Sequence, residues 1–323
     1  MNQWPTPVKY KFIKKNNTFS QKKIKKIEKF FCKKYNSKYS FLCPSARSSL
    51  NLILKYLKFD RTNTVSIPKW SSNCLYQSMG PVSNISVGDN LSDALLIVHK
   101  WGNTYKINNK SNKVCIIEDS ADCLPNTKYT PFENKSEFEI ISLPKIIGSY
   151  SGGIVLTNNK KFYMHGKKEQ IKNKNLGAQQ SKNKYEYWLS KNKKKNEWYY
   201  KEHLNTSFDG NVIDNILDCL KYYEKNLLII KKRQKLLKEV IPKLSFDEKR
   251  LGPCIVFEEK KYPYLKNILE LKHFNFSKKA NKGKYEKCFI MPIHFQIADK
   301  LFNNKLKKII NNKKNDKRKN NFS

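Results

Sequence analysis

The stretch Cys115-Ile116-Ile117-Glu118-Asp119-Ser120-Ala121-Asp122 joins an apolar run directly to a group of acidic residues. A short apolar run of this kind is typical of a strand buried in a parallel sheet. Ligands of open α/β sheets bind at the carboxyl ends of the strands, which is where Asp119 and Asp122 are expected. A carboxylate at that edge can pair with a cationic group of a ligand, or it can cap a following helix.

Six other short apolar runs flank this one, and helical patterns separate several of them. The alternation favours an α/β fold with a largely parallel, seven-stranded sheet and right-handed crossovers. Helices are expected at 18–36, 50–57 and 71–79. Strands are expected at 39–43, 64–67, 85–87, 94–99, 113–117, 138–143 and 153–157.

The second half of the chain has a different composition. Residues 158–204 are rich in lysine, asparagine and glutamine, with interleaved tyrosines and tryptophans. These aromatic residues either pin an exposed connection to the body of the protein or stack on RNA bases. We expect helices over 212–240 and 264–271, a strand at 254–257 and a frayed tail over 303–323.

These patterns divide the chain into a large α/β domain, a smaller C-terminal α+β domain and a basic tail. The proposed bounds are 1–204 for the large domain, with 158–204 as its lysine-rich connection, 205–310 for the small domain and 311–323 for the tail.

Charge is the most prominent property of the composition. Among the 323 residues, 65 are basic and 27 acidic, which gives a formal net charge of +38. Only five of the basic residues are arginines, the preferred readers of phosphates and base edges. Lysine and asparagine share adenine-rich codons, so we attribute the charge mainly to an AT-rich genome, with nonspecific attraction of RNA as a second possibility.

Several classes of protein are excluded by the same composition. Apolar residues make up 39% of the chain, which rules out wholesale disorder. No apolar run approaches the ~20 residues needed to cross a bilayer, and the basic N-terminus has no apolar signal region. The eight cysteines form no C-x-x-C pair or zinc pattern, so we expect reduced thiols in a cytoplasmic protein without a metal.

Two further segments carry candidate chemistry. Residues Pro44 to Ser49 lie between an expected strand and helix, and the N-H groups and hydroxyls of a helix N-terminus form an anion site. In Ile141 to Val155, Lys145 stands between an apolar strand and a Gly-Gly pair. Its apolar neighbours would favour the neutral, nucleophilic form of the amine if it is buried.

Together, these three segments have the order that pyridoxal phosphate (PLP) enzymes need. A lysine forms the Schiff base with the cofactor, a strand-end aspartate keeps the pyridine nitrogen protonated, and a helix N-terminus takes the phosphate.

The sequence also resembles a known family, the DegT/StrS sugar aminotransferases, which are fold-type I PLP enzymes. The family patterns S-G-T-x-A-L, V-H-x-x-G, E-D-x-A, S-(x)n-K before G-G, and L-P-x-H have counterparts here. In the same order, the matching segments are Ser45–Leu50, Val98–Gly102, Glu118–Ala121, Ser142 with Lys145 and Gly152-Gly153, and Met291–His294. In addition, Ile67–Trp70 resembles the family's segment of strand, proline and aromatic residue.

The resemblance implies a role for each matching residue. Lys145 would form the Schiff base with the cofactor, and Asp119 would pair with the pyridine nitrogen. Trp70 would stack on the ring, and Asp122 would lie near the ring oxygen, where the family usually has glutamine or histidine.

The phosphate of the cofactor would be bound by Ser142 together with Ser45 and the backbone at Ala46 and Arg47. Ala46 replaces the family's glycine and Arg47 replaces a small hydroxyl residue, a change that a cation beside a phosphate compensates. His99 and His294 match family positions and are interpreted as packed structural histidines.

The family's usual reaction is transamination of a nucleotide-linked keto sugar, with glutamate as the amino donor, for surface polysaccharide biosynthesis. Lys145 would move the proton as general acid and base. Because the family's site lies at a subunit interface, the resemblance also implies a homodimer.

Three alternatives remain open at this stage. Some relatives catalyse dehydration, typically with histidine in the lysine position, which Lys145 disfavours. The changes at Ala46, Arg47 and Asp122 are compatible with an inactive relative that binds PLP or a sugar nucleotide without turnover. A basic nucleic-acid-binding protein would explain the charge but not the Asp119 and Lys145 layout.

Overall fold

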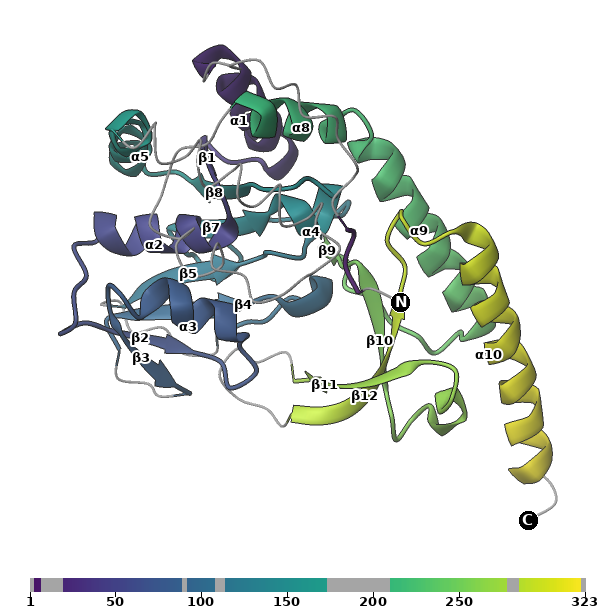
Figure 1. The fold of residues 1–323 in the computed structure, drawn as a ribbon. Helices are drawn as coiled ribbons and strands as arrows, with labels where there is room; N and C mark the ends of the chain where they lie inside the picture. The colour runs from purple at the N-terminus through teal and green to yellow at the C-terminus, as the bar shows by residue number, and fades with distance from the viewer. Residues whose placement is uncertain are drawn as a thin grey trace, which may run out of the picture.

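The computed structural model describes residues 3–6, 20–88, 92–107, 114–172, 210–277 and 285–320. Figure 1 shows a large sheet with helices on both faces and a smaller sheet beside it, flanked by two long helices. In these ranges no helix combines the length and the apolar character that a membrane crossing requires.

The large sheet has the seven strands that the apolar runs predict, each within two residues of its expected bounds. The strand order is β1-β8-β7-β5-β4-β2-β3, and every neighbouring pair is parallel except those that β8 makes with β7 and β1. The expected α/β fold with a largely parallel sheet is therefore confirmed. The strands are β1 (Tyr39–Cys43), β2 (Thr64–Ile67), β3 (Asn84–Val87), β4 (Ala94–Val98), β5 (Cys115–Asp119), β7 (Phe138–Ser142) and β8 (Gly153–Thr157).

Alternating side chains of these strands enter two different cores. Leu42 and Ile154 pack with helices α1 (Gln21–Tyr35) and α8 (Gly210–Leu220) on one face. Phe41 and Val155 pack with α2 (Ala46–Tyr56), α3 (Asn73–Met79) and α5 (Lys160–Lys172) on the other. This is the period-two burial expected of strands covered on both faces.

The expected helix at 18–36 is confirmed as α1. The Ser20 side chain accepts the N-H of Lys23 at its start, and Asn36 ends it in a left-handed conformation. The first part of the lysine-rich connection, predicted to be exposed, forms α5 and buries Phe162. Residues 173–204 of that connection, including its tyrosines and tryptophans, lie outside the described residues.

The predicted helix over 212–240 is two helices, α8 and α9 (Tyr223–Val240), which separate at Lys221 and Tyr222. Each half has its own partner. Val212 and Ile216 of α8 belong to the same buried cluster as the apolar residues of α1. Arg233 of α9 instead donates to three backbone carbonyls in the segment before the last helix. The break lets the two halves point at different parts of the molecule.

Two C-terminal predictions are wrong. The expected helix at 264–271 is a short 3-10 turn (η3, Pro263–Leu265) followed by strand β11 (Glu270–Asn275), because pairing with β12 (Tyr285–Pro292) overrides the helical spacing. The expected frayed tail at 303–323 is helical through Asn320 in α10 (Asp299–Asn320), because it buries Ile309 and docks its lysines on backbone carbonyls.

The predicted strand at 254–257 is confirmed as β10 (Cys254–Glu258). It forms an antiparallel three-stranded sheet in the order β10-β12-β11. Just before it, β9 (Arg250–Leu251) pairs with β6 (Leu124–Pro125), which directly follows the acidic end of β5. The C-terminal chain is thereby tied to the large sheet next to Asp119.

A glycine pair permits this junction. Gly102 ends the turn η1 (Lys100–Gly102) after β4 with a φ of +79°, and Trp101 before it also has a positive φ. A Cβ on Gly252 would lie 1.9 Å from the Trp101 carbonyl oxygen, so the two backbones meet without room for a side chain. The glycine of the V-H-x-x-G segment is therefore required by backbone geometry.

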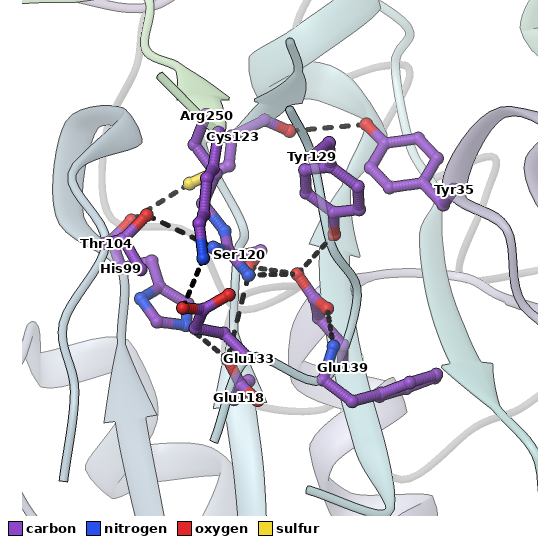
Figure 2. Close-up of polar contacts among 12 residues, drawn as sticks. Tyr35, His99, Thr104, Glu118, Ser120, Cys123, Tyr129, Glu133, Glu139 and Arg250 are labelled. Carbon is purple, nitrogen blue, oxygen red and sulfur yellow. Dashed lines mark hydrogen bonds and ion pairs between the residues drawn. The ribbon is translucent and has the colours of Figure 1, made fainter. Parts of the chain in front are cut away.

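A buried ionic network reinforces the same junction (Figure 2). Glu118 and Glu139 lie directly opposite each other on β5 and β7, and both side chains are fully buried. The Arg250 guanidinium lies 3.1 Å from Glu139 Oε1 and 3.6 Å from Glu118 Oε2, and His99 Nε2 lies 2.6 Å from Glu118 Oε2. Burial acts to raise the pKa of Glu118, but His99 and Arg250 hold it below its usual value.

Arg250→Met tests the weight of this network. The substitution leaves two opposed carboxylates buried without their cation, so the free energy of unfolding should fall by about 3–5 kcal/mol. Chemical denaturation of the full chain measures the change. Lys128→Met, which removes an ion pair whose two side chains are both 70% exposed, is the matched control and should change stability much less. Equal effects of the two substitutions would contradict a structural role for the buried network.

Candidate functional site

The carboxyl ends of β7 and β1 and the amino end of the antiparallel strand β8 meet at one edge of the large sheet. Ser142 ends β7 and is paired with Gly153 of β8, which is paired in turn with Cys43 at the end of β1. Helix α2 starts immediately beyond Cys43, after Pro44 and Ser45. A Cβ on Gly153 would lie 2.3 Å from the Ser45 carbonyl carbon. The structure therefore brings the start of α2 and Ser142 to opposite sides of a glycine that allows close contact.

The start of α2 is built as a capping box. The Ser45 hydroxyl accepts the Ser48 N-H at 3.1 Å, and the Ser48 hydroxyl accepts the Ser45 N-H at 2.8 Å. The predicted binding residue Ser45 thus uses its side chain as a helix cap. Ala46 and Arg47 form the first turn, whose N-H groups point out of the helix end, which is the arrangement that binds anions.

Lys145 lies on the short helix α4 (Leu143–Ile147), which follows β7 directly and ends at Gly148. Burial acts to lower its pKa, but the carboxylates of Asp122 and Asp119 outweigh burial, so the pKa of Lys145 is raised above its usual value. The expectation that apolar neighbours keep Lys145 neutral is therefore wrong. Those neighbours, Ile146 and Ile147, are buried in the core, whereas the lysine ammonium faces acidic residues.

Asp119 ends β5 as predicted, and its carboxylate accepts the N-H of Ala121 at 2.9 Å. Burial raises the pKa of Asp119 to about 6, with Lys145 opposing the rise and Asp122 adding to it. The alternative in which these acidic residues cap a helix is wrong, because the two-residue strand β6 follows β5. Asp119 and Asp122 thus influence the charge of Lys145, which lies more than twenty residues further along the chain.

Asp122 is held by two tryptophans. Its Oδ1 accepts the backbone N-H of Trp101 at 3.1 Å, and its Oδ2 accepts the indole N-H of Trp4 at 3.4 Å. The Trp4 ring also lies under Lys145, with Nζ 5.0 Å from the ring centroid. Sequence reasoning identified neither contact, because Trp4 carries no motif and Trp101 acts through its backbone.

Trp70 is almost completely buried in an apolar cluster with Trp101 and Tyr105, and its ring centroid lies 5.8 Å from that of Tyr105. Trp4 packs against the same cluster. Among the described residues the buried indole nitrogen of Trp70 has no hydrogen-bond partner. Stacking of Trp70 on a cofactor ring stays a prediction.

The two family-matched histidines lie in packed surroundings. His99 is fully buried, with Nε2 on Glu118 and Nδ1 accepting the N-H of Tyr105 at 3.0 Å. The backbone carbonyl of His294 accepts from Arg233 at 2.6 Å. Both histidines are nearly or fully buried. The described residues contain no group of three or more His, Cys, Asp or Glu arranged to hold a metal.

The donor set at the sheet edge suits PLP. An aldehyde needs an amine, which Lys145 supplies, and a pyridine nitrogen needs a buried carboxylate, which Asp119 supplies. A phosphate needs N-H and hydroxyl donors, which the start of α2 and Ser142 offer. Asp122 is the one departure, because it adds a negative charge beside Lys145.

Comparison with known proteins agrees with this fit. A family described as "Putative PLP-dependent aminotransferase" matches residues 27–313. No curated protein sequence matches the chain.

Three solved structures illustrate the likeness of fold. "Putative sugar aminotransferase Spr1654 from Streptococcus pneumoniae, PLP-form" is 10% identical with a TM-score of 0.65, covering 97% of this chain and 98% of that one. Helicobacter pylori PseC, "aminotransferase involved in the biosynthesis of pseudoaminic acid", is 14% identical with a TM-score of 0.60, covering 96% and 98%. The E. coli GDP-4-keto-6-deoxy-D-mannose-3-dehydratase with bound hydrated PLP is 11% identical with a TM-score of 0.61, covering 95% and 99%.

At these identities the solved structures show the fold alone, whereas the family match covers most of the chain. The chain belongs to the family of PLP-dependent aminotransferases, and it has the fold of the DegT/StrS-type sugar aminotransferases that its motifs resemble.

Proposed function

We propose that the protein transfers an amino group from glutamate to a nucleotide-linked keto sugar in the cytoplasm, for surface polysaccharide biosynthesis. The observation that carries the proposal is that Lys145 and the buried carboxylate of Asp122 both contact Trp4, at the edge of the sheet where the buried Asp119 ends β5. The similar fold of a sugar aminotransferase and of PseC supports a sugar as the amino acceptor.

When bound, PLP supplies an aldehyde that accepts an amino group and a ring that withdraws electrons. In our proposal the Lys145 amine would hold the aldehyde end of the cofactor, and its Nζ would carry a proton between the reacting atoms. Asp119 would pair with the ring nitrogen. The burial of Asp119 excludes water from that contact. Because burial also raises its pKa, a cationic partner would stabilise its charged carboxylate.

The phosphate-binding part of the proposal rests on Ser142, Ser45, Ala46 and Arg47. The first-turn N-H groups of α2 orient the phosphate, and the Arg47 guanidinium adds a cation at the same helix end. Trp70 forms the apolar wall beside the ring. Asp122, fixed by the Trp101 N-H, keeps a negative charge near the Lys145 ammonium when the lysine is free.

The overall charge supports anionic substrates. A net charge of +38 raises the local concentration of glutamate and of a sugar linked to a nucleotide diphosphate. Lysine at position 145 favours transamination over dehydration, although a dehydratase shares the fold. We further propose a homodimer with the site at the subunit interface, and a domain division near residue 204.

Substitution of Lys145 tests the central step. Wild-type protein mixed with PLP should give a yellow absorbance band that glutamate discharges. Lys145→Ala should show no such band, and its rate of amino transfer should fall by roughly 10²- to 10⁴-fold. Lys128→Ala, at an exposed lysine on another surface, is the control and should behave as wild type. A wild-type band that resists glutamate would instead favour an inactive or dehydrating relative.

Asp119→Asn tests the second role through stability as well as activity. Because the pKa of Asp119 is about 6 in the folded chain and 3.8 ordinarily, the folded state binds its proton more tightly and loses stability as pH rises between those values. Without cofactor, Asp119→Asn should therefore match wild type below about pH 4 and exceed it by on the order of 2–3 kcal/mol above about pH 6.

The same substitution should lower amino transfer at least about a hundredfold, because asparagine cannot hold the ring proton. Urea unfolding across pH measures the first effect and steady-state kinetics the second. A variant that is fully active, or no more stable than wild type at pH 7, would contradict the role given to Asp119.

A further inference from the structure

The N-terminal residues Gln3–Thr6, here called the N-terminal strap, lie against the candidate site. The N-H and hydroxyl of Thr6 donate to Gln296 Oε1 at 2.6 and 3.0 Å, and the Thr6 carbonyl accepts from Gln296 Nε2 at 2.6 Å. A Cβ on Gly148, at the end of α4, would lie 3.3 Å from the Thr6 carbonyl oxygen, so the strap passes close to α4. Three hydrogen bonds to the Gln296 side chain therefore hold the strap at Thr6, two residues after Trp4 in the chain.

Trp4 touches both kinds of charge in the site. The face of its ring lies 5.0 Å from Lys145 Nζ, and its indole N-H donates to Asp122 Oδ2 at 3.4 Å. Its ring is partly buried against the cluster that contains Trp70 and Trp101. A single side chain thus covers the ammonium and bonds the carboxylate that attracts it.

The contact with Lys145 favours the form of the lysine that does not react. An indole face attracts an ammonium group but has no such attraction for a neutral amine. A lysine nitrogen bonds an aldehyde carbon only through its free electron pair, so the ammonium must first give up a proton to solvent, and the condensation then releases one water.

We propose that Trp4 is a positioning residue that covers Lys145 and holds it as an ammonium, so that cofactor reaches the lysine only after the N-terminal strap moves away. The inference rests on the proposed function, in which Lys145 is the residue that bonds PLP. The contacts of Trp4 with Lys145 and Asp122, on which the inference is built, do not depend on the identity of the cofactor.

Trace acetylation with acetic anhydride tests the masking without any cofactor. Mass spectrometry of peptides from the full chain gives the rate at Lys145 relative to exposed Lys128. Trp4→Ala should raise that ratio between about twofold and about thirtyfold, the range expected for loss of a cation–π contact. Trp4→Phe keeps a ring but not the indole N-H and should change it least.

Gln296→Ala provides a second route that leaves Trp4 intact. Loss of the three hydrogen bonds to Thr6 should loosen the strap and raise the Lys145 ratio in the same direction, by less than Trp4→Ala. An unchanged or lower ratio in both Trp4→Ala and Gln296→Ala would overturn the proposal.

The rate at which added PLP develops its absorbance band links the masking to the cofactor. Both variants should load PLP faster than wild type. Slower or weaker loading would overturn the proposal, because Trp4 would then be a supporting wall of the cofactor site. If no protein binds PLP while the acetylation ratio still rises, the proposed function fails and the masking of Lys145 by Trp4 stands.

Discussion

The ion pairing of Arg250 with Glu118 and Glu139 is the interaction on which the rest of the arrangement depends. It places a cation from the C-terminal chain between two carboxylates that face each other on neighbouring strands of the large sheet. Two buried carboxylates side by side are costly without such a partner. The same chain segment pairs β9 with β6 and brings Gly252 against Trp101, so the network fixes the loop that presents Asp122.

The two acidic residues at the end of β5 consequently have separate tasks. Successive side chains of a strand point to opposite faces, so Glu118 enters the network with Arg250 and His99 while Asp119 meets Lys145. Burial raises the pKa of Asp119, which means that the negative charge of its carboxylate is unfavourable in the site without a cofactor. In the function that we propose, a cationic group bound beside Asp119 would offset this cost.

Much of the fold could be predicted because it is encoded locally. Apolar runs such as Ala94–Val98 identified all seven strands, and the order of Asp119, Lys145 and Gly153 identified the edge at which they meet. The errors arise where distant contacts decide. Pairing with β12 made a strand from Glu270 onward where a helix was expected, and burial of Ile309 kept the C-terminal tail helical. The carboxylate of Asp122 raises the pKa of Lys145, whose apolar neighbours suggested a neutral amine. Trp4 could not be found at all, since its partners lie more than a hundred residues away.

The central claim is that Lys145 is the residue to which the cofactor bonds. The most direct measurement is to add PLP to the full-length wild-type protein, fix the lysine–cofactor bond with borohydride, digest the product and locate the added mass by peptide mass spectrometry. The account predicts a single modified peptide that carries the cofactor on Lys145. Modification spread over exposed lysines, or confined to a lysine other than Lys145, would contradict it.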